Sequence, residues 1–427
     1  MSTLDAVVHG ASEVVVGPEG DRGEEFSRLT VQEDGAVAVV DGTVAAVGPS
    51  AEVCRQYPTE NADTVLDTGG QAVLPGFVDS HTHALFAGDR SDEFAARLRG
   101  KSYQTILDEG GGIRRTVRAV RSATDEHLLA RLLDHLDTML AAGTTTVEVK
   151  SGYGLDAATE RRMLDVVARA RETHPIDVVP TFMGAHAVPE GVDTDTYVEN
   201  VVEEQLPAVS GKDLAAFCDV FCEDGIFSVE QSRRVLTAGD EHGLVPKVHA
   251  EEFCNLGGAR LAAEVGAASA DHLLHATEDD AVALADAGVT PVVLPGTAFG
   301  LGTDYADARM LRATGAPIGL ATDFNPNCHA PTMPFAVTLA CVEMGLPPGE
   351  AIAAATRGGA LALAGDHELA LDPDEEVGRL CSGAPGDVVV LDAPSHGHVP
   401  YRFGEPVVDT VLKGGQVVAC PAEGVRR

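Results

Sequence analysis

Runs of consecutive apolar residues, each ended by polar residues, recur through the middle of the chain. Between several of them lie stretches with apolar residues at helical spacing, such as residues 125–143 and 157–174. A nearly continuous apolar run is typical of a parallel strand covered on both faces, and helices between the strands supply that cover. The runs are QAVLPGFVDSH, TTTVEVKSGY, IDVVPTFMGAH, FCDVFCED, LVPKVHAEEF, ASADHLL, TPVVLPG and PIGLATDFN. The pattern therefore predicts an α/β fold, a (β/α)8 TIM-like barrel.

An open, doubly wound sheet is the alternative for alternating strands and helices. No G-x-G-x-x-G follows the first predicted strand. The glycine cluster EGGGIRRT (109–116) has neither the spacing nor the lysine of a phosphate-binding loop. We therefore favour the barrel, and we interpret the glycine cluster as a mobile loop at its mouth.

The two ends of the chain show shorter apolar runs that meet at tight turns. AVAVVDGTVAAVG has two such runs around Asp41-Gly42, and VVDTVLKGGQVVA has two around Gly414-Gly415. An Asp-Gly pair between apolar runs is a strong signal for a β-hairpin. We expect residues 1–70 and 376–427 to form one small β-sandwich domain, with the barrel as a separate domain over residues 71–375.

The charge balance narrows the possible partners. The chain has 66 acidic and 30 basic residues, a formal net charge of −36. This charge repels nucleic acid and anionic membranes, so we expect neither as a partner. The acidic residues are spread along the whole chain, which suits either a solubility-biased surface or adaptation to high salt. We favour a halophilic protein, whose folding and activity weaken at low ionic strength.

Other bulk features point to a cytoplasmic protein. No apolar run approaches the ~20 residues that span a membrane, and the first residues lack the pattern of a secretion signal. The eight cysteines have no framework spacing, so we expect free thiols rather than disulfides.

Polar residues repeatedly follow the predicted barrel strands. A single histidine there is an ordinary structural residue, but five of the strands deliver histidine or aspartate to the same rim, where barrel enzymes carry their chemistry. These residues are His81 and His83 after the first strand, His186 after the third, His249 in the fifth, His272 in the sixth and Asp323 after the eighth. His81 and His83 are two apart, so both point to one face of a regular strand.

Three imidazoles and a carboxylate suit Zn²⁺ or Fe²⁺ and leave room for a water molecule. Such an ion lowers the pKa of its water towards ~7, which makes hydrolysis the natural chemistry. FCDVFCED contains no lysine that a second metal ion could share, so we expect one ion.

The motifs VDSHTHALFAGDR, EVKSGYGL, TFMGAHAVP, VHAEEF and LATDFNP together resemble the imidazolonepropionase family of the amidohydrolase superfamily. The resemblance covers essentially the whole chain. It implies hydrolysis of the cyclic amide C–N bond of 4-imidazolone-5-propanoate to N-formimidoyl-L-glutamate, the third step of histidine degradation, by attack of a metal-bound hydroxide. It also implies one divalent metal ion per subunit, Zn or Fe, and a homodimer.

The same resemblance suggests roles for individual residues. The metal ligands are His81, His83, His249 and Asp323. The substrate-binding residues are Arg90, Tyr153, His186, Glu252, Asn325, Asn327 and Cys328, and the catalytic residues are His272, Glu252 and Asp323. Which of the last three moves the proton stays open. An arginine fork such as that of Arg90 suits the propanoate carboxylate.

One motif departs from the family. Asn327 and Cys328 stand where the family has Gly and Ser, so a side-chain contact from Cys328 is in doubt. Asn327 tolerates a left-handed backbone, so we expect the turn to survive, and we do not expect Cys328 to act as a nucleophile. Asp271 and His329 are candidates for orienting ligands, and Lys150 for a structural or substrate-contacting role.

Two rival functions remain. Another amidohydrolase, acting on cytosine or guanine, would share the metal ligands and differ in the pocket. A non-catalytic barrel would keep only the scaffold.

Overall fold

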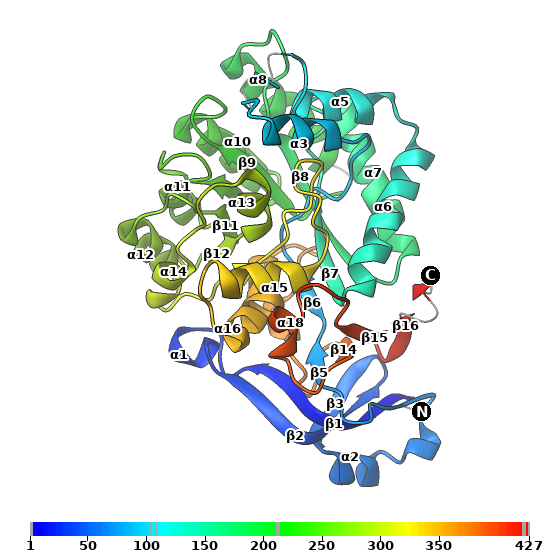
Figure 1. Ribbon diagram of the computed structural model, residues 1–427. Coiled ribbons are helices and arrows are strands. Elements are labelled where there is room, and N and C mark those ends of the chain that lie inside the picture. The colour runs from blue at the N-terminus through cyan, green and yellow to red at the C-terminus, as the bar shows by residue number, and fades with distance from the viewer. Residues whose placement is uncertain (1–2, 103–104, 107–108, 211–213, 421–423, 426–427) are drawn as a thin grey trace.

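The protein is described by a computed structural model over residues 3–102, 105–106, 109–210, 214–420 and 424–425 (Figure 1). Its centre is an eight-stranded parallel sheet in the order β13-β12-β11-β10-β9-β8-β7-β6. Each predicted apolar run contributes one strand to this sheet, so the (β/α)8 barrel is confirmed. The strands are β6 (Phe77–Asp79), β7 (Thr144–Lys150), β8 (Asp177–Ala185), β9 (Phe217–Cys222), β10 (Val245–Ala250), β11 (Ser269–His272), β12 (Thr290–Val293) and β13 (Gly319–Leu320).

Helices surround this sheet (Figure 1). The two long helices expected from apolar spacing are present as α6 (Asp125–Ala141) and α7 (Ala157–Thr173). Several helices begin at a side chain that accepts a backbone N–H, which satisfies a group that the first turn leaves unpaired. Thr124 and Asp156 do so for α6 and α7, and Ser228 for α10 (Val229–Glu241).

The remaining helices connect the strands or cover the rim. They are α1 (Gly23–Phe26), α2 (Ser50–Gln56), α3 (Ser91–Leu98), α5 (Ile113–Ser122), α8 (Thr194–Asn200), α9 (Leu206–Ser210), α11 (Gly258–Val265), α12 (Glu278–Ala287), α13 (Pro295–Leu301), α14 (Ala308–Ala313), α15 (Met333–Val342), α16 (Pro348–Ala353), α17 (Gly359–Ala362) and α18 (His398–Tyr401). No helix within the described residues is long and apolar enough to cross a membrane.

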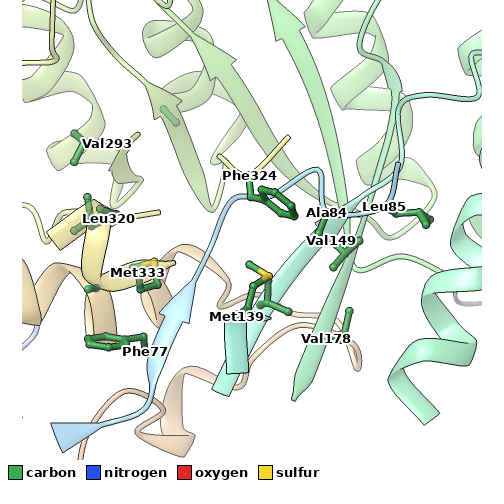
Figure 2. Packing of buried hydrophobic residues seen from close by; sticks show 14 of the residues in the cluster. Phe77, Ala84, Leu85, Met139, Val149, Val178, Val293, Leu320, Phe324 and Met333 are labelled. Atoms are coloured by element: carbon green, nitrogen blue, oxygen red, sulfur yellow. The ribbon is translucent and has the colours of Figure 1, made fainter. Parts of the chain in front are cut away.

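The core lies between strands and helices. One large cluster of buried apolar side chains joins the barrel strands to the helices around them. Figure 2 shows members of this cluster on strands, such as Val149 and Leu320, together with Met139 of α6 and Met333 of α15. Burial of this surface is what fixes the strands in register beneath the rim.

The barrel closes at a seam between its first and last strands. β6 and β13 do not form a ladder, and hydrogen bonds across their ends join them instead. Asp79 accepts from the backbone N–H of Thr322 (3.0 Å) and from its hydroxyl (2.6 Å), across 243 positions of sequence. The N–H of Asp323 donates to the carbonyl of His81 (3.0 Å), and the N–H of His83 donates to that of Phe324 (2.9 Å). Predicted site residues therefore form part of the seam itself.

Both ends of the chain join one nine-stranded sheet, which we call the terminal sheet. Its order is β17-β16-β15-β14-β5-β1-β2-β3, with β4 paired to β1. The strands are β1 (Leu4–Pro18), β2 (Leu29–Val40), β3 (Thr43–Pro49), β4 (Thr64–Asp67), β5 (Val73–Pro75), β14 (Val388–Leu391), β15 (Val408–Lys413), β16 (Gln416–Cys420) and β17 (Gly424–Val425). A separate sheet built from both termini is thus confirmed, and the division into domains at residues 70 and 375 stays a prediction.

The two expected hairpins connect strands of this sheet. Asp41 and Gly42 turn the chain from β2 to β3 with φ of 48° and 79°. Gly414 and Gly415 turn it from β15 to β16 with φ of 53° and 80°. Positive φ at both central positions is what a two-residue hairpin of matching twist requires.

Candidate active site

Three predicted ligands meet at the carboxyl ends of the barrel strands. His81 and His83 follow β6, and His249 lies near the end of β10. One ligand atom from each ring lies within 4.8 Å of the other two, and all three side chains are buried. The Nε2 atoms of His83 and His249 are 3.3 Å apart. The structure therefore contains a three-histidine cluster with the spacing of a metal site.

Buried carboxylates set the orientation of two of these rings. Nδ1 of His81 lies 2.6 Å from Oδ2 of Asp271, and Nδ1 of His249 lies 3.1 Å from Oδ1 of Asp219. Because an ionised carboxylate only accepts hydrogen bonds, the proton of each ring is on Nδ1 and the lone pair is on Nε2. Asp271 thus contacts the ring of His81, and its role in orienting a metal ligand stays a prediction.

Of these two Nε2 atoms, that of His249 faces Nε2 of His83, whereas that of His81 has no hydrogen-bond partner among the described residues. Nε2 of His81 is buried and has no hydrogen bond to any described residue. Burial lowers the pKa of His81 and His83 well below the ordinary value, and the neighbouring positive groups lower it further. A buried, neutral imidazole with an unused lone pair is a ready metal ligand, so the donor set fits a divalent cation.

Asp323 faces the same gap. Its Oδ1 lies 3.6 Å from Nε2 of His81 and 3.7 Å from Nε2 of His83. Oδ2 accepts from the hydroxyl of Thr297, and Oδ1 accepts from Nδ2 of Asn325 at 3.0 Å. Its φ is 48°, in the left-handed region that non-glycine residues rarely adopt, and strained backbone of this kind concentrates at functional sites.

His272 and Glu252 form a second pair beside the cluster. Oε2 of Glu252 lies 3.7 Å from Nε2 of His272, and the two imidazoles of His272 and His249 are 5.1 Å apart between centroids. Burial raises the pKa of Glu252 well above its ordinary value, and the negative charges of Asp323 and Glu223 raise it further. His272 also has a left-handed φ, 79°. A carboxyl group that holds its proton easily thus lies next to a neutral imidazole.

Tyr153 and His186 line one side of the histidine cluster. The ring of His186 stacks on that of His83, with centroids 4.7 Å apart, and Tyr153 lies 5.3 Å from His186. The loop that carries Tyr153 is held by Glu160, whose carboxylate accepts from the N–H groups of Gly152, Gly154 and Leu155. Three such bonds fix the loop without contact from solvent.

Arg90 is 8% exposed and precedes α3. Its Nε donates to Oε2 of Glu93 at 2.8 Å. Glu93 also accepts from the N–H of Gly112, so one carboxylate holds both Arg90 and the glycine cluster. Since the bond uses Nε, the two terminal nitrogens of the guanidinium keep their donors for another group.

The turn after Asp323 survives the Asn-Cys replacement in a different way from that expected. Oδ1 of Asn325 accepts from the N–H groups of Asn327 (2.7 Å) and Cys328 (3.0 Å), and Asn327 is not among the residues with positive φ. Burial raises the pKa of Cys328 to about 12, and the charge of Asp323 adds to the effect. The thiol is therefore protonated at neutral pH, which agrees with the expectation that Cys328 is not a nucleophile.

Sequence reasoning missed a set of buried charges beneath the histidines. Lys150, the last residue of β7, is fully buried, with Nζ 2.8 Å from Oε1 of Glu148 and 2.7 Å from Oδ2 of Asp219. Lys247 is also fully buried and donates to the carbonyl of Ser80 at 3.0 Å. A usable signal was present, because Lys247 lies two positions before His249 and so shares its face of the strand.

Comparison with known proteins gives two matches to family models. Residues 72–418 match the amidohydrolase family, and residues 35–59 match an imidazolonepropionase-like composite domain of bacteria. The chain is 66% identical over 421 residues to an imidazolonepropionase of Haloarcula marismortui, which covers 99% of this chain and 97% of that protein. It is 59% identical over 424 residues to an imidazolonepropionase of Halobacterium salinarum, which covers 98% of each chain.

Solved structures with the same fold have diverged further in sequence. An adenosine deaminase from Xanthomonas campestris with bound zinc superposes with a TM-score of 0.74 at 19% identity, over 100% of this chain and 95% of that chain. Guanine deaminase of E. coli superposes with a TM-score of 0.71 at 18% identity, over 98% of this chain and 99% of that chain. At these identities the likeness shows the fold alone.

Proposed function

The chain belongs to the imidazolonepropionase family of the amidohydrolases and is a hydrolase. We therefore propose that it hydrolyses 4-imidazolone-5-propanoate to N-formimidoyl-L-glutamate. The observation that carries the proposal is the convergence of His81, His83 and His249 within 4.8 Å, on a chain that is 66% identical to a named imidazolonepropionase. The bond broken is the cyclic amide C–N bond of the substrate ring.

We propose that one divalent ion, Zn or Fe, is held by His81, His83, His249 and Asp323. Support comes from the unpartnered Nε2 of His81 and from Asp323 Oδ1, which lies 3.6 and 3.7 Å from two of the imidazoles. When bound, such an ion activates a water molecule as nucleophile near neutral pH and polarises a carbonyl group. Asp219 on β9 is already bonded to Lys150 and His249, which supports a single ion.

Arg90, Tyr153 and His186 are proposed to bind and orient the substrate. The terminal guanidinium nitrogens of Arg90 suit the propanoate carboxylate as a bidentate pair. Glu93 holds Arg90 through Nε, so the fork is ordered before the substrate arrives. Asn325, Asn327 and Cys328 complete the proposed pocket through the turn that follows Asp323.

The proton transfers are proposed for His272, Glu252 and Asp323. Glu252 and His272 lie 3.7 Å apart, close enough to act on one ring edge of a small heterocycle. Glu252 donates or accepts a proton at a ring nitrogen, and His272 polarises the carbonyl or accepts a proton from water. Breaking the C–N bond then requires one of these residues to return a proton to the leaving nitrogen.

We further propose a cytoplasmic homodimer adapted to high salt. The net charge of −36 supports salt adaptation, and the relatives from Haloarcula marismortui and Halobacterium salinarum come from halophiles.

The test is to incubate metal-loaded protein in high salt with freshly prepared imidazolone propanoate and to measure N-formimidoyl-L-glutamate. Guanine, cytosine and adenosine serve as parallel substrates. We expect turnover of the propanoate alone. Release of ammonia from a nucleobase, with no turnover of the propanoate, would instead assign the site to an aminohydrolase. Turnover of none of them by metal-loaded protein would favour a non-catalytic barrel.

A further inference from the structure

Beneath the three-histidine cluster the barrel encloses five ionisable side chains with no solvent exposure. We call them the buried charge layer: Glu148, Lys150, Asp219, Lys247 and Asp271. They come from four strands: β9, β10 and β11 are consecutive in the sheet, and β7 is separated from β9 by β8. Charges are costly to enclose in a protein interior unless each is paired, so their arrangement calls for an explanation beyond packing.

Lys150 reaches a metal-site histidine through one carboxylate. Its Nζ lies 2.7 Å from Oδ2 of Asp219, and that same oxygen lies 3.0 Å from Nδ1 of His249. Asp219 is thus held from two sides, by an ammonium below and by an imidazole N–H above. A carboxylate fixed in this way leaves the ring little freedom to rotate or to shift its proton.

Lys247 makes the matching connection to the other oriented histidine. Its Nζ donates to the carbonyl of Ser80 at 3.0 Å, just before His81, and lies 3.9 Å from Oδ2 of Asp271. Asp271 holds Nδ1 of His81 at 2.6 Å. Lys247 therefore acts on His81 both through its carboxylate partner and through the backbone that precedes it.

Glu148 links the two lysines. Oε1 of Glu148 lies 2.8 Å from Nζ of Lys150 and 3.3 Å from Nζ of Lys247, and it accepts from the hydroxyl of Thr181 at 2.5 Å. The two halves of the layer are therefore one connected network, centred on a glutamate that touches no histidine.

The formal charges of these side chains indicate which kind of ion the network would stabilise. Three carboxylates and two ammonium groups leave the layer with one negative charge, and Asp323 above it adds a second. An imidazole binds a metal ion in its neutral form, so the formal charges of these groups, beneath and beside the gap between the imidazoles, sum to two negative charges. A divalent cation bound between the imidazoles would neutralise the two negative charges of the buried charge layer and Asp323.

We propose that Lys150 and Lys247 are positioning residues for the metal site, Lys150 acting on His249 through Asp219 and Lys247 acting on His81 through Asp271, with Glu148 coupling the two. This inference rests on the proposed function only in requiring that the site binds a divalent ion.

The test measures metal affinity and does not depend on the substrate. Full-length wild type, Lys150→Met and a matched control, Lys413→Met, are freed of metal in high salt and titrated with Zn²⁺ against a chromophoric chelator. Lys413 is a fair control because its ammonium also pairs with two carboxylates, Asp177 and Asp387, but where the terminal sheet meets the first residue of β8. We expect Lys150→Met to lose about 10-fold or more in affinity and to alter the visible spectrum of bound Co²⁺. Lys413→Met keeps the wild-type affinity and spectrum.

A double-mutant cycle separates positioning from general damage. If Lys150 acts through Asp219, the substitution Lys150→Met changes affinity much less in the Asp219→Asn background than in wild type. If Lys150→Met does not fold, Lys247→Met with Asp271→Asn provides the same cycle at His81.

Wild-type affinity and an unchanged Co²⁺ spectrum in the folded lysine variants would overturn the inference, as would full additivity in the cycle. Those outcomes leave the proposed function intact. Failure of wild type itself to bind Zn²⁺ or Co²⁺ would overturn the proposed function, so the two failures are distinguishable.

Discussion

The barrel interior and the terminal sheet each pair a lysine with two carboxylates, but the consequences differ. In the barrel, Lys150 lies between Glu148 and Asp219 with no exposure, and Asp219 continues to a histidine of the site. In the terminal sheet, Lys413 of β15 lies between Asp387 and Asp177, and Asp177 is the first residue of the barrel strand β8. The ion pairs of Lys150 continue to the histidine cluster, whereas the ion pairs of Lys413 connect the terminal sheet to the barrel sheet. Lysine–carboxylate ion pairs therefore orient a histidine side chain in the barrel, and they attach the terminal sheet to the barrel in the other region.

The largest expected effect comes from removing one histidine at the rim of the barrel, compared with one histidine beside the terminal sheet. We expect His249→Ala to remove bound metal and to lower kcat/KM by more than about a thousandfold, because a ligand of the ion is lost. His396→Ala is the matched control, since His396 also pairs with a carboxylate, Glu13 at 2.7 Å, but beside the terminal sheet. Metal content by atomic emission and steady-state kinetics measure the difference. Equal losses in both variants would remove the distinction between the regions.

Arg90 and Arg402 allow the same comparison for arginine. Arg90→Ala is expected to raise KM for the propanoate substrate about 100-fold with a smaller change in kcat, because it removes charge-assisted hydrogen bonds worth about 3 kcal/mol. Arg402 bonds to Asp392 and Glu405 next to the terminal sheet, so Arg402→Ala should leave KM unchanged. Initial-rate kinetics decide the point. Unchanged KM in Arg90→Ala would show that another group binds the carboxylate.

Lys413→Met should affect stability and spare the chemistry. Removing the ammonium leaves Asp387 buried without its cation, so we expect the free energy of unfolding to fall by about 2 to 3 kcal/mol. Denaturant unfolding in high salt measures the loss, and kcat and KM should stay within about twofold of wild type. Adding Asp387→Asn should recover part of the stability, because a neutral amide needs no cation. A large fall in kcat with unchanged stability would contradict an attachment role.

The smallest expected effect concerns the acid stability of the junction between the regions. Asp21, which follows β1, pairs with Arg357 at 2.9 Å and Arg379 at 2.8 Å. Burial raises the pKa of Asp21, but the two guanidinium groups outweigh it and hold the pKa below its ordinary value of 3.8. A lowered pKa in the folded state gives stability that is present above pH 3.8 and is lost as the pH falls through the folded value.

Asp21 is partly exposed, so solvent screening limits this contribution to about 1 kcal/mol or less. We expect Asp21→Asn to be less stable than wild type at pH 6 and to approach wild-type stability near pH 3. Unfolding measured across that range tests the sign. A difference that grows towards low pH would contradict the assignment.

Much of this architecture could be predicted from the sequence, because the deciding signals are local. The apolar runs of the barrel strands and the turns at Asp41-Gly42 and Gly414-Gly415 are each contained in a few residues. The histidine cluster was within reach as well, since His81, His83 and His249 all follow or end predicted strands, and a barrel brings strand ends together.

The orienting contacts could not be predicted so well, because they depend on which faces meet across the barrel. The pairing of Lys150 with Asp219 joins β7 to β9, which are not adjacent strands. The sequence places Lys150 at a strand end and says nothing of its partner. Glu93 and Glu160 were missed for a related reason: each holds backbone N–H groups of a loop, and this requires the loop conformation to be known.

The seam of the barrel also has a consequence for synthesis of the chain. The groups that close it, Asp79 with Thr322 and His81 with Asp323, are supplied by opposite ends of the barrel sequence, with 243 positions between the first two. Contacts this distant form late, since most of the chain must already be ordered before they can. A nascent chain that ends before the last strand therefore holds three of the proposed ligands, and its first strand can pair with β7 but lacks the groups that close the seam on its other side. The site becomes complete in the same step that closes the barrel, so a truncated product would not bind metal as the full chain does.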